Sequence, residues 1–130
     1  MGDGKRGQEM RTLAKHNRGQ SLVEFALVIP ILVALMVGIF QFSLALMTKN
    51  VMTNAAREGA RVQAVGGDGE AEAYRVLNSA NIPATANVAP AASAYGSVFA
   101  DVTYEFPLSV PFYRTGTISL RSTATMRQEF

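Results

Sequence analysis

The stretch that decides the fold is residues 18–47, RGQSLVEFALVIPILVALMVGIFQFSLALM. Between Ser21 and Met47 the only charged residue is Glu24. As an α-helix these 27 residues would be about 40 Å long, against a hydrocarbon core of about 30 Å. Sixteen of them are Leu, Ile, Val or Phe, and inserting these side chains outweighs the cost of one carboxylate, about +3 kcal/mol at most. The sequence therefore predicts one membrane-spanning helix.

Charge is distributed unevenly around this helix. Residues 1–19 carry five basic and two acidic side chains, a net charge of +3, whereas residues 20–130 carry seven basic and eight acidic ones. Basic residues remain on the cytoplasmic side of a membrane, so we expect the N-terminus inside and everything after residue 48 outside. Three segments follow: a basic cytoplasmic leader (1–19), a membrane helix that continues outside (20–65) and a small extracytoplasmic domain (66–130).

Two other interpretations of the apolar run are open. Ser43-Leu44-Ala45 offers the small-x-small pattern of a signal-peptidase site, and cleavage there would release a product starting at Leu46. Against this, the run is about twice as long as the apolar core of a signal peptide. The run could also be the core helix of a soluble protein, but 130 residues leave little chain to surround it.

Two residues near the start of the run are unusual for a membrane helix. Pro30 has no N–H, so the carbonyl of Ala26 lacks its helical partner, which predicts a kink or a loosened turn there. Glu24 is ionisable, and such groups inside membranes usually face a partner. Together they favour a helix built to pack against other helices.

The residues around Glu24 resemble the processing site of type IV prepilins. That site is a glycine, here Gly19, which follows a short basic leader and precedes a long apolar helix. The resemblance implies a peptidase cut after Gly19, a mature chain that begins at Gln20, and Glu24 as its fifth residue. Phe25 stands where the Tad (Flp) branch of that superfamily favours an aromatic residue.

Further stretches are similar to the TadE-like family of minor pseudopilins. They are LVEFALVIP (22–30), Gly38-Ile39, NAAREGAR (54–61) and, near the end, ATMRQE (124–129). The resemblance implies a minor pilin that primes, caps or joins a tight-adherence (Tad) pilus. Its implied partners are the major Flp-type pilin, other minor pseudopilins, the prepilin peptidase, the inner-membrane assembly platform and membrane lipid. The implied location is the inner membrane and then the pilus at the cell surface.

Cleavage after Gly19 would give Glu24 a physical role. The new α-amine is largely cationic at neutral pH, and Glu24 lies about 6 Å from it along a helix. A pair between this amine and Glu24, within one chain or between staggered chains, offsets the cost of desolvating both charges. Our hypothesis is that the intermolecular pair sets the axial register of a subunit that joins a filament.

Residues 49–65 have helical spacing and predict that the membrane helix continues into water. The apolar side is expected to hold Val51, Ala55, Val62 and Val65, and the polar side Asn50, Asn54, Arg57, Glu58 and Arg61. Small residues at Ala55, Ala56, Gly59 and Ala60 allow another backbone to approach closely. They either pack on this chain's own sheet or form an intersubunit surface. Glu58 and Arg61 are spaced to pair, which at an exposed site contributes about 0–1 kcal/mol.

The remainder predicts a small α+β domain of pilin-like type. Gly66-Gly67-Asp68-Gly69 ends the long helix and caps a short one, residues 70–80, whose buried side is Ala73, Val76, Leu77 and Ala80. Residues 84–94 give a weak strand, and alternation predicts strands at 98–106 and 118–127 with a loop at 107–116 between them. The expected fold is a long N-terminal helix, a short helix and an antiparallel sheet of about three strands.

Several function classes find no support in the sequence. The one histidine, His16, lies in the leader, cysteine is absent, and no base–nucleophile spacing is recognisable, so we expect no enzyme activity and no cofactor. Asp68, Glu70 and Glu72 are too few for a metal loop. A net charge of −1 after residue 19 disfavours nucleic-acid binding. The alternative to a pilin is an uncleaved membrane-anchored domain with a periplasmic binding or regulatory role.

Overall fold

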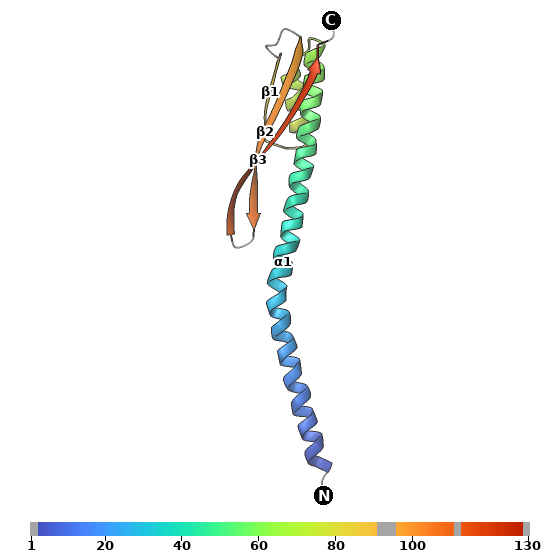
Figure 1. Cartoon of the computed structure of the whole chain (residues 1–130), viewed down its shortest axis with the longest axis vertical. Helices are drawn as coiled ribbons and strands as arrows, with labels where there is room; N and C mark the ends of the chain where they lie inside the picture. Colours follow the sequence, from blue (N-terminus) through green and yellow to red (C-terminus); the bar gives the residue numbers. More distant parts are fainter. Residues whose placement is uncertain (1–2, 91–95, 111–112, 129–130) are drawn as a thin grey trace. The chain divides into compact units, whose positions relative to one another are not determined.

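The computed structural model describes residues 3–90, 96–110 and 113–128. In chain order it contains α1 (Asp3–Ala64), α2 (Gly69–Ser79), β1 (Thr85–Pro90), β2 (Ser97–Val110) and β3 (Tyr113–Arg127) (Figure 1). A long apolar helix, a short second helix and a three-stranded antiparallel sheet confirm the predicted α+β fold.

Helix α1 includes the basic leader, the apolar run and the predicted outer helix. Pro30 lies inside it, and the helix does not end there, so the kink stays a prediction. The chain divides into two units, Met1–Ile39 and Phe40–Phe130. The second unit combines the C-terminal half of α1 with α2 and the sheet, and it contains the whole hydrophobic core.

The turn between the helices follows the predicted glycine-rich stretch. Gly66 has a φ of 84°, a conformation that side chains disfavour, and the N–H of Gly67 donates to the carbonyl of Val62 at 2.9 Å. Asp68 caps α2, since its side chain accepts from the N–H of Ala71 at 3.0 Å. Helix α2 agrees with the prediction to within one residue at each end, and Ala80 is exposed in the turn beyond it instead of buried.

The strands are ordered β1-β2-β3, with both pairs antiparallel. The predicted loop at 107–116 is wrong, because β2 continues to Val110 and β3 begins at Tyr113, so strands cover most of it. Pro107 suggested a loop because proline has no N–H to donate to a neighbouring strand. In the structure Pro107 pairs with Thr117 on β3, and the register between the two strands shifts between Pro107 and Ser109. The weak strand at 84–94 is β1, and its predicted residues 91–94 lie outside the described ones.

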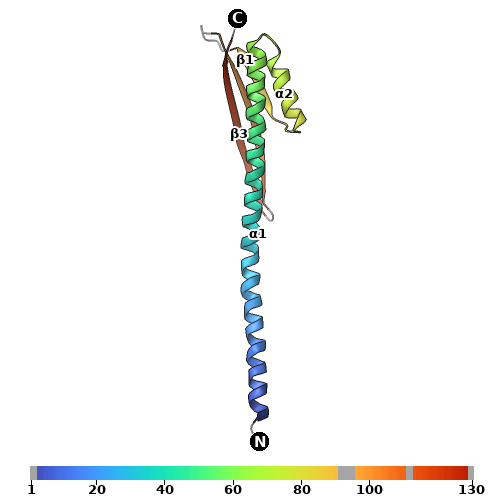
Figure 2. The same cartoon turned by 90° about the vertical axis from the view of Figure 1, so that its right-hand side faces the viewer.

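One face of the sheet packs against α1 and α2, which the second view shows on the same side of the strands (Figure 2). Alternate residues of β2, Val98, Ala100 and Val102, are buried there, as the period-2 pattern predicted. The residues of α1 in this core are Met52, Ala55, Ala56, Ala60 and Ala64. Val65 was predicted on this side but is 72% exposed, because α1 ends at Ala64 and Val65 lies in the turn.

Candidate functional site

The predicted processing and register residues lie together on α1. Gly19, Gln20, Glu24 and Phe25 occupy about two consecutive helical turns, and Pro30 follows five residues after Phe25. All five are exposed. Gln20 and Glu24 are one turn apart, about 6 Å along the axis, so a carboxylate and an amine at these positions could pair within the chain or with a neighbour.

Large apolar side chains along this part of α1 are uncovered. They include Leu22, Phe25, Ile31, Leu35, Ile39, Phe40 and Phe42, all more than 60% exposed. Among the described residues, α1 is the single helix long and apolar enough to cross a membrane. An uncovered surface of this size is unstable in water but suits lipid or neighbouring helices. The helix therefore indicates membrane anchoring.

Gly19 has no packing role within this chain. A Cβ built on it meets nothing within 4 Å. Glycine costs about 1 kcal/mol relative to alanine in a helix interior, so this helix would be more stable with alanine there. The residue type at position 19 is therefore not explained by the chain's own fold.

The small residues of AAREGAR are buried inside the protein. Ala55, Ala56, Gly59 and Ala60 are covered by this chain's own sheet and α2, so these side chains are not available to another subunit. At Gly59 the backbones of α1 and α2 nearly touch, since a Cβ there would lie 2.7 Å from the carbonyl oxygen of Gly69. The glycine of the motif is thus required by packing of α1 on α2.

The charged residues of the same motif face outward. Arg57 is exposed, and the Arg61 guanidinium pairs with the Glu58 carboxylate. The hydrogen bond from Arg61 lowers the pKa of Glu58, and the same contact raises the pKa of Arg61. Arg75 on α2 likewise lowers the pKa of Glu72 through a hydrogen bond. These are solvated ion pairs, which stabilise the helices slightly and form no reactive centre.

Polar contacts that the sequence did not predict fix α1 against β3. The hydroxyls of Thr53 and Ser122 are 2.8 Å apart, and the ammonium of Lys49 donates to the carbonyl of Arg121. The Arg121 side chain reaches across the outer face to Asp101 on β2. Ser122 could have been suspected from its position, because it is a polar residue in the apolar set of an alternating strand.

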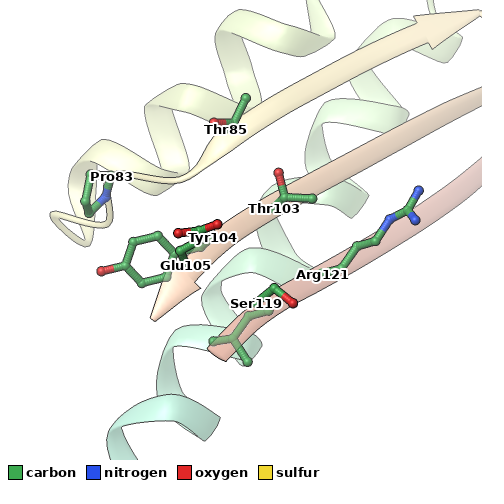
Figure 3. A pocket seen from close by; sticks show the side chains of 8 residues that line it. Pro83, Thr85, Thr103, Tyr104, Glu105, Ser119 and Arg121 are labelled. Atoms are coloured by element: carbon green, nitrogen blue, oxygen red, sulfur yellow. The ribbon is translucent and has the colours of Figure 1, made fainter. Parts of the chain in front are cut away.

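An open depression of about 540 Å³ lies at the sheet (Figure 3). Its lining comes from the three strands and the turn before β1: Pro83, Thr85, Thr103, Tyr104, Glu105, Ser119, Leu120 and Arg121. Charges of both signs border it without converging on one point, which suits a surface contact better than a small-molecule site. Within the described ranges, no three or more Asp, Glu or His side chains come together as metal ligands.

The decisive comparison concerns the part of α1 that carries these residues. Residues 19–61 match the TadE-like protein family. The match confirms the predicted resemblance over this TadE-like segment, which begins at Gly19 and ends at Arg61. It indicates a protein associated with the Tad pilus. No curated protein and no solved structure matches the chain.

Proposed function

We propose that this protein is a minor pilin, or pseudopilin, of a Tad-type pilus. In this proposal it is processed after Gly19 and takes part in pilus initiation, assembly or incorporation at the tip or shaft, and so in adhesion. The alignment of the TadE-like segment carries the proposal, because it starts at the glycine of the predicted processing site and runs through the outer helix to Arg61.

The structure supports processing in two ways. A Cβ at Gly19 would meet nothing, so a glycine there fits a requirement set by a second protein, such as a peptidase, better than one set by folding. Gly19 also lies within continuous helix, and a peptidase must open the helix to reach the bond. Because glycine weakens a helix by about 1 kcal/mol, the chain opens more readily there than at an alanine.

The mechanism we propose for assembly is structural. The uncovered apolar side chains of α1 pack against other pilin helices, which replaces lipid contacts by protein contacts. The new amine of Gln20 then pairs with Glu24 of a neighbouring subunit and sets its axial position. The partners are the major Flp-type pilin, companion pseudopilins, the prepilin peptidase and the inner-membrane assembly platform.

The location we propose is the inner membrane, with one pass, the N-terminus in the cytoplasm and the sheet outside. The charge difference between residues 1–19 and the rest supports this orientation. After assembly the protein would belong to the pilus at the cell surface.

The N-terminal residue of the protein recovered from pili tests the processing step directly. We expect Gln20. A chain that still starts at Met1 or Gly2 would contradict the proposal and indicate an uncleaved membrane anchor. A start at Leu46 would indicate a secreted product. A Gly19→Leu variant is expected to retain its leader and to be missing from the pilus fraction.

The register role of Glu24 needs a separate experiment. We expect Glu24→Ala to be cleaved normally but to enter pili much less efficiently than the parent chain, since the charge pair is lost. Glu24→Gln keeps the size and a hydrogen-bonding group but not the charge, so it should share the defect. Glu70→Ala, an exposed carboxylate on α2, is the matched control. Normal incorporation of Glu24→Ala, measured as its share of sheared pili, would refute the role.

A further inference from the structure

We propose that the free edge of β3 binds an extended acidic segment of another protein, which joins the sheet as a fourth strand. This edge, called the open edge below, runs along residues 117–127, where β3 pairs with β2 in one continuous register. The inference goes beyond the proposed pilus role, because it rests on the unit Phe40–Phe130 alone and requires neither processing nor a pilus.

The direction of the backbone groups in the sheet follows from a contact at β1. Successive residues of a strand send their N–H and C=O groups to opposite edges. The N–H of Ala86 points away from β2, because it donates to the hydroxyl of Tyr74 on α2 at 3.3 Å. Ala86 lies opposite Val102, whose groups therefore point away from β1 and bond Ser122 on β3. Even-numbered residues of β3 in this stretch thus bond β2, and odd-numbered ones point outward.

Two contacts at β3 agree with this alternation. The ammonium of Lys49 on α1 donates to the carbonyl of Arg121, which therefore points outward. The N–H of Gln128 donates at 2.9 Å or less to the carbonyl of Gly96, just before β2, and so points inward. The residues whose backbone groups point out of the open edge are Thr117, Ser119, Arg121, Thr123, Thr125 and Arg127, and their side chains are exposed.

The other edges of the sheet are protected against pairing. Strand β1 has six residues, ends at Pro90, and has Tyr74 of α2 bonded to its edge. Where β2 extends beyond β1, Pro107 has no N–H to offer. Helix α2 lies on the opposite side of α1 from β3 (Figure 2). Short, covered or proline-containing edges resist strand addition. In the part of the chain that the structure describes, Lys49 makes the one side-chain bond to an outward backbone group of the open edge.

The charges on β3 beside the open edge are basic. Residues 106–128 contain three arginines and no acidic residue. Two of these arginines, Arg121 and Arg127, are exposed on the outer face of β3. Of the acidic residues on this face of β2, Asp101 pairs with Arg121, and Glu105 lies one strand further from the edge.

The α1 side of the open edge is basic as well. Lys49 contacts the edge, and Arg57 is exposed one helical turn after Thr53, which bonds Ser122 on β3. Residues 25–57 contain no acidic residue. Basic side chains therefore border the open edge on both faces of the sheet.

This charge selects the occupant. A second copy would bring the same basic edge, and like charges on paired strands destabilise the pairing. An extended segment with an acidic residue at every second position places these residues on one face, where they meet Arg121 and Arg127. The backbone bonds of such a segment supply affinity, and its charges supply selectivity.

Binding of a synthetic peptide to the full-length protein in detergent micelles tests the proposal. The probe is an eight-residue, end-blocked peptide that alternates threonine and glutamate and carries a fluorophore, so that anisotropy reports binding. Two control peptides separate charge from strand pairing. One has lysine in place of glutamate, and the other is the acidic peptide with methyl groups on its backbone nitrogens, which removes every donor.

A pair of variants locates the binding edge. Thr123→Pro removes an outward N–H that the sheet does not use, so the variant is expected to fold, as unchanged far-UV circular dichroism would show. Thr123→Val keeps this N–H and the size of the side chain, and it is the matched control. We expect saturable binding of the acidic peptide to the parent and to Thr123→Val, and binding at least about tenfold weaker to Thr123→Pro. Both control peptides should also bind the parent at least about tenfold more weakly.

Four results would overturn the proposal. They are no saturable binding of the acidic peptide at millimolar concentration, equal binding of the lysine peptide, equal binding of the methylated peptide, and equal binding to Thr123→Pro and Thr123→Val. A parent that is dimeric by light scattering, with a monomeric Thr123→Pro, would also contradict it, since a second copy would then occupy the edge. The comparison between peptides uses the parent chain, so it remains decisive if Thr123→Pro fails to fold.

Discussion

Replacing Gly59 by alanine should destabilise the outer domain, although the same change normally stabilises a helix. Gly59 lies where α1 crosses the start of α2. A methyl group there would be 2.7 Å from the carbonyl oxygen of Gly69, 3.1 Å from the Cβ of Ala73 and 3.2 Å from a methyl of Val88. The first of these contacts is with backbone, which cannot rotate away, so α2 must shift.

The size of the effect follows from opposing terms. Alanine in place of glycine gains about 1 kcal/mol in a helix interior. Overpacking of a close contact costs about 1–3 kcal/mol. A shift of α2 also strains its cap, where Gly69 N–H donates to Gln63 at 3.1 Å and Asp68 accepts from Ala71, at about 1 kcal/mol for each bond lost. We expect a net loss of about 1–3 kcal/mol.

Thermal unfolding of the full chain in detergent, followed by circular dichroism at a strand-sensitive wavelength, measures this loss. In a domain of this size each kcal/mol lowers the melting temperature by about 4–8 °C. Gly116→Ala is the control, because a Cβ there meets nothing within 4 Å, and it should leave the melting temperature nearly unchanged. A Gly59→Ala chain as stable as the parent would refute the argument that the motif glycine exists for the α1–α2 crossing.

Three other changes test the core and the surface. Leu77→Ala empties a fully buried site and should cost about 2–5 kcal/mol in denaturant unfolding, whereas Val65→Ala, at an exposed site, should cost little. Ser122→Ala removes one hydrogen bond in the core and should cost about 1 kcal/mol by the same measurement. The pKa values of Glu58 and Glu72 are lower in the folded protein than the unfolded value of 4.5. The stability that these two carboxylates add is therefore fully present above pH 4.5 and is lost as the pH falls through their folded pKa values. A Glu58→Gln/Glu72→Gln chain should therefore lose less stability than the parent between pH 7 and pH 3, and an unchanged pH profile would contradict the pairing.

The elements that the sequence predicted well are those whose pattern is local. The apolar run, a helix cap at Asp68 or Gly69 and the alternation of β2 each depend on residues within one element. The structure agrees with them, and it gives Asp68 as the cap. The sequence did not predict the length of the hairpin. Pro107 lacks the N–H that a strand donates to its neighbour, which locally suggests the end of a strand. Whether β2 continues beyond Pro107 is decided by its pairing with β3, which is distant in the sequence.

The candidate site could be predicted because its pattern is also local to one element. The TadE-like segment is a linear motif on one helix, so its residues could be identified without the fold. The burial of Ala55 and Gly59 could not be decided, because a small-residue face suits contact with another subunit as well as contact with the chain's own α2. Only the position of α2, set by the turn at Gly66, decides between them.

The structure also bears on cleavage after Ala45. A product that starts at Leu46 would keep every residue of the core, since the first core residue on α1 is Met52. Folding therefore does not depend on the apolar run, and a soluble form of the domain would still be stable. The N-terminal residue of the mature protein, and not the stability of its core, therefore distinguishes release after Ala45 from attachment to the membrane helix.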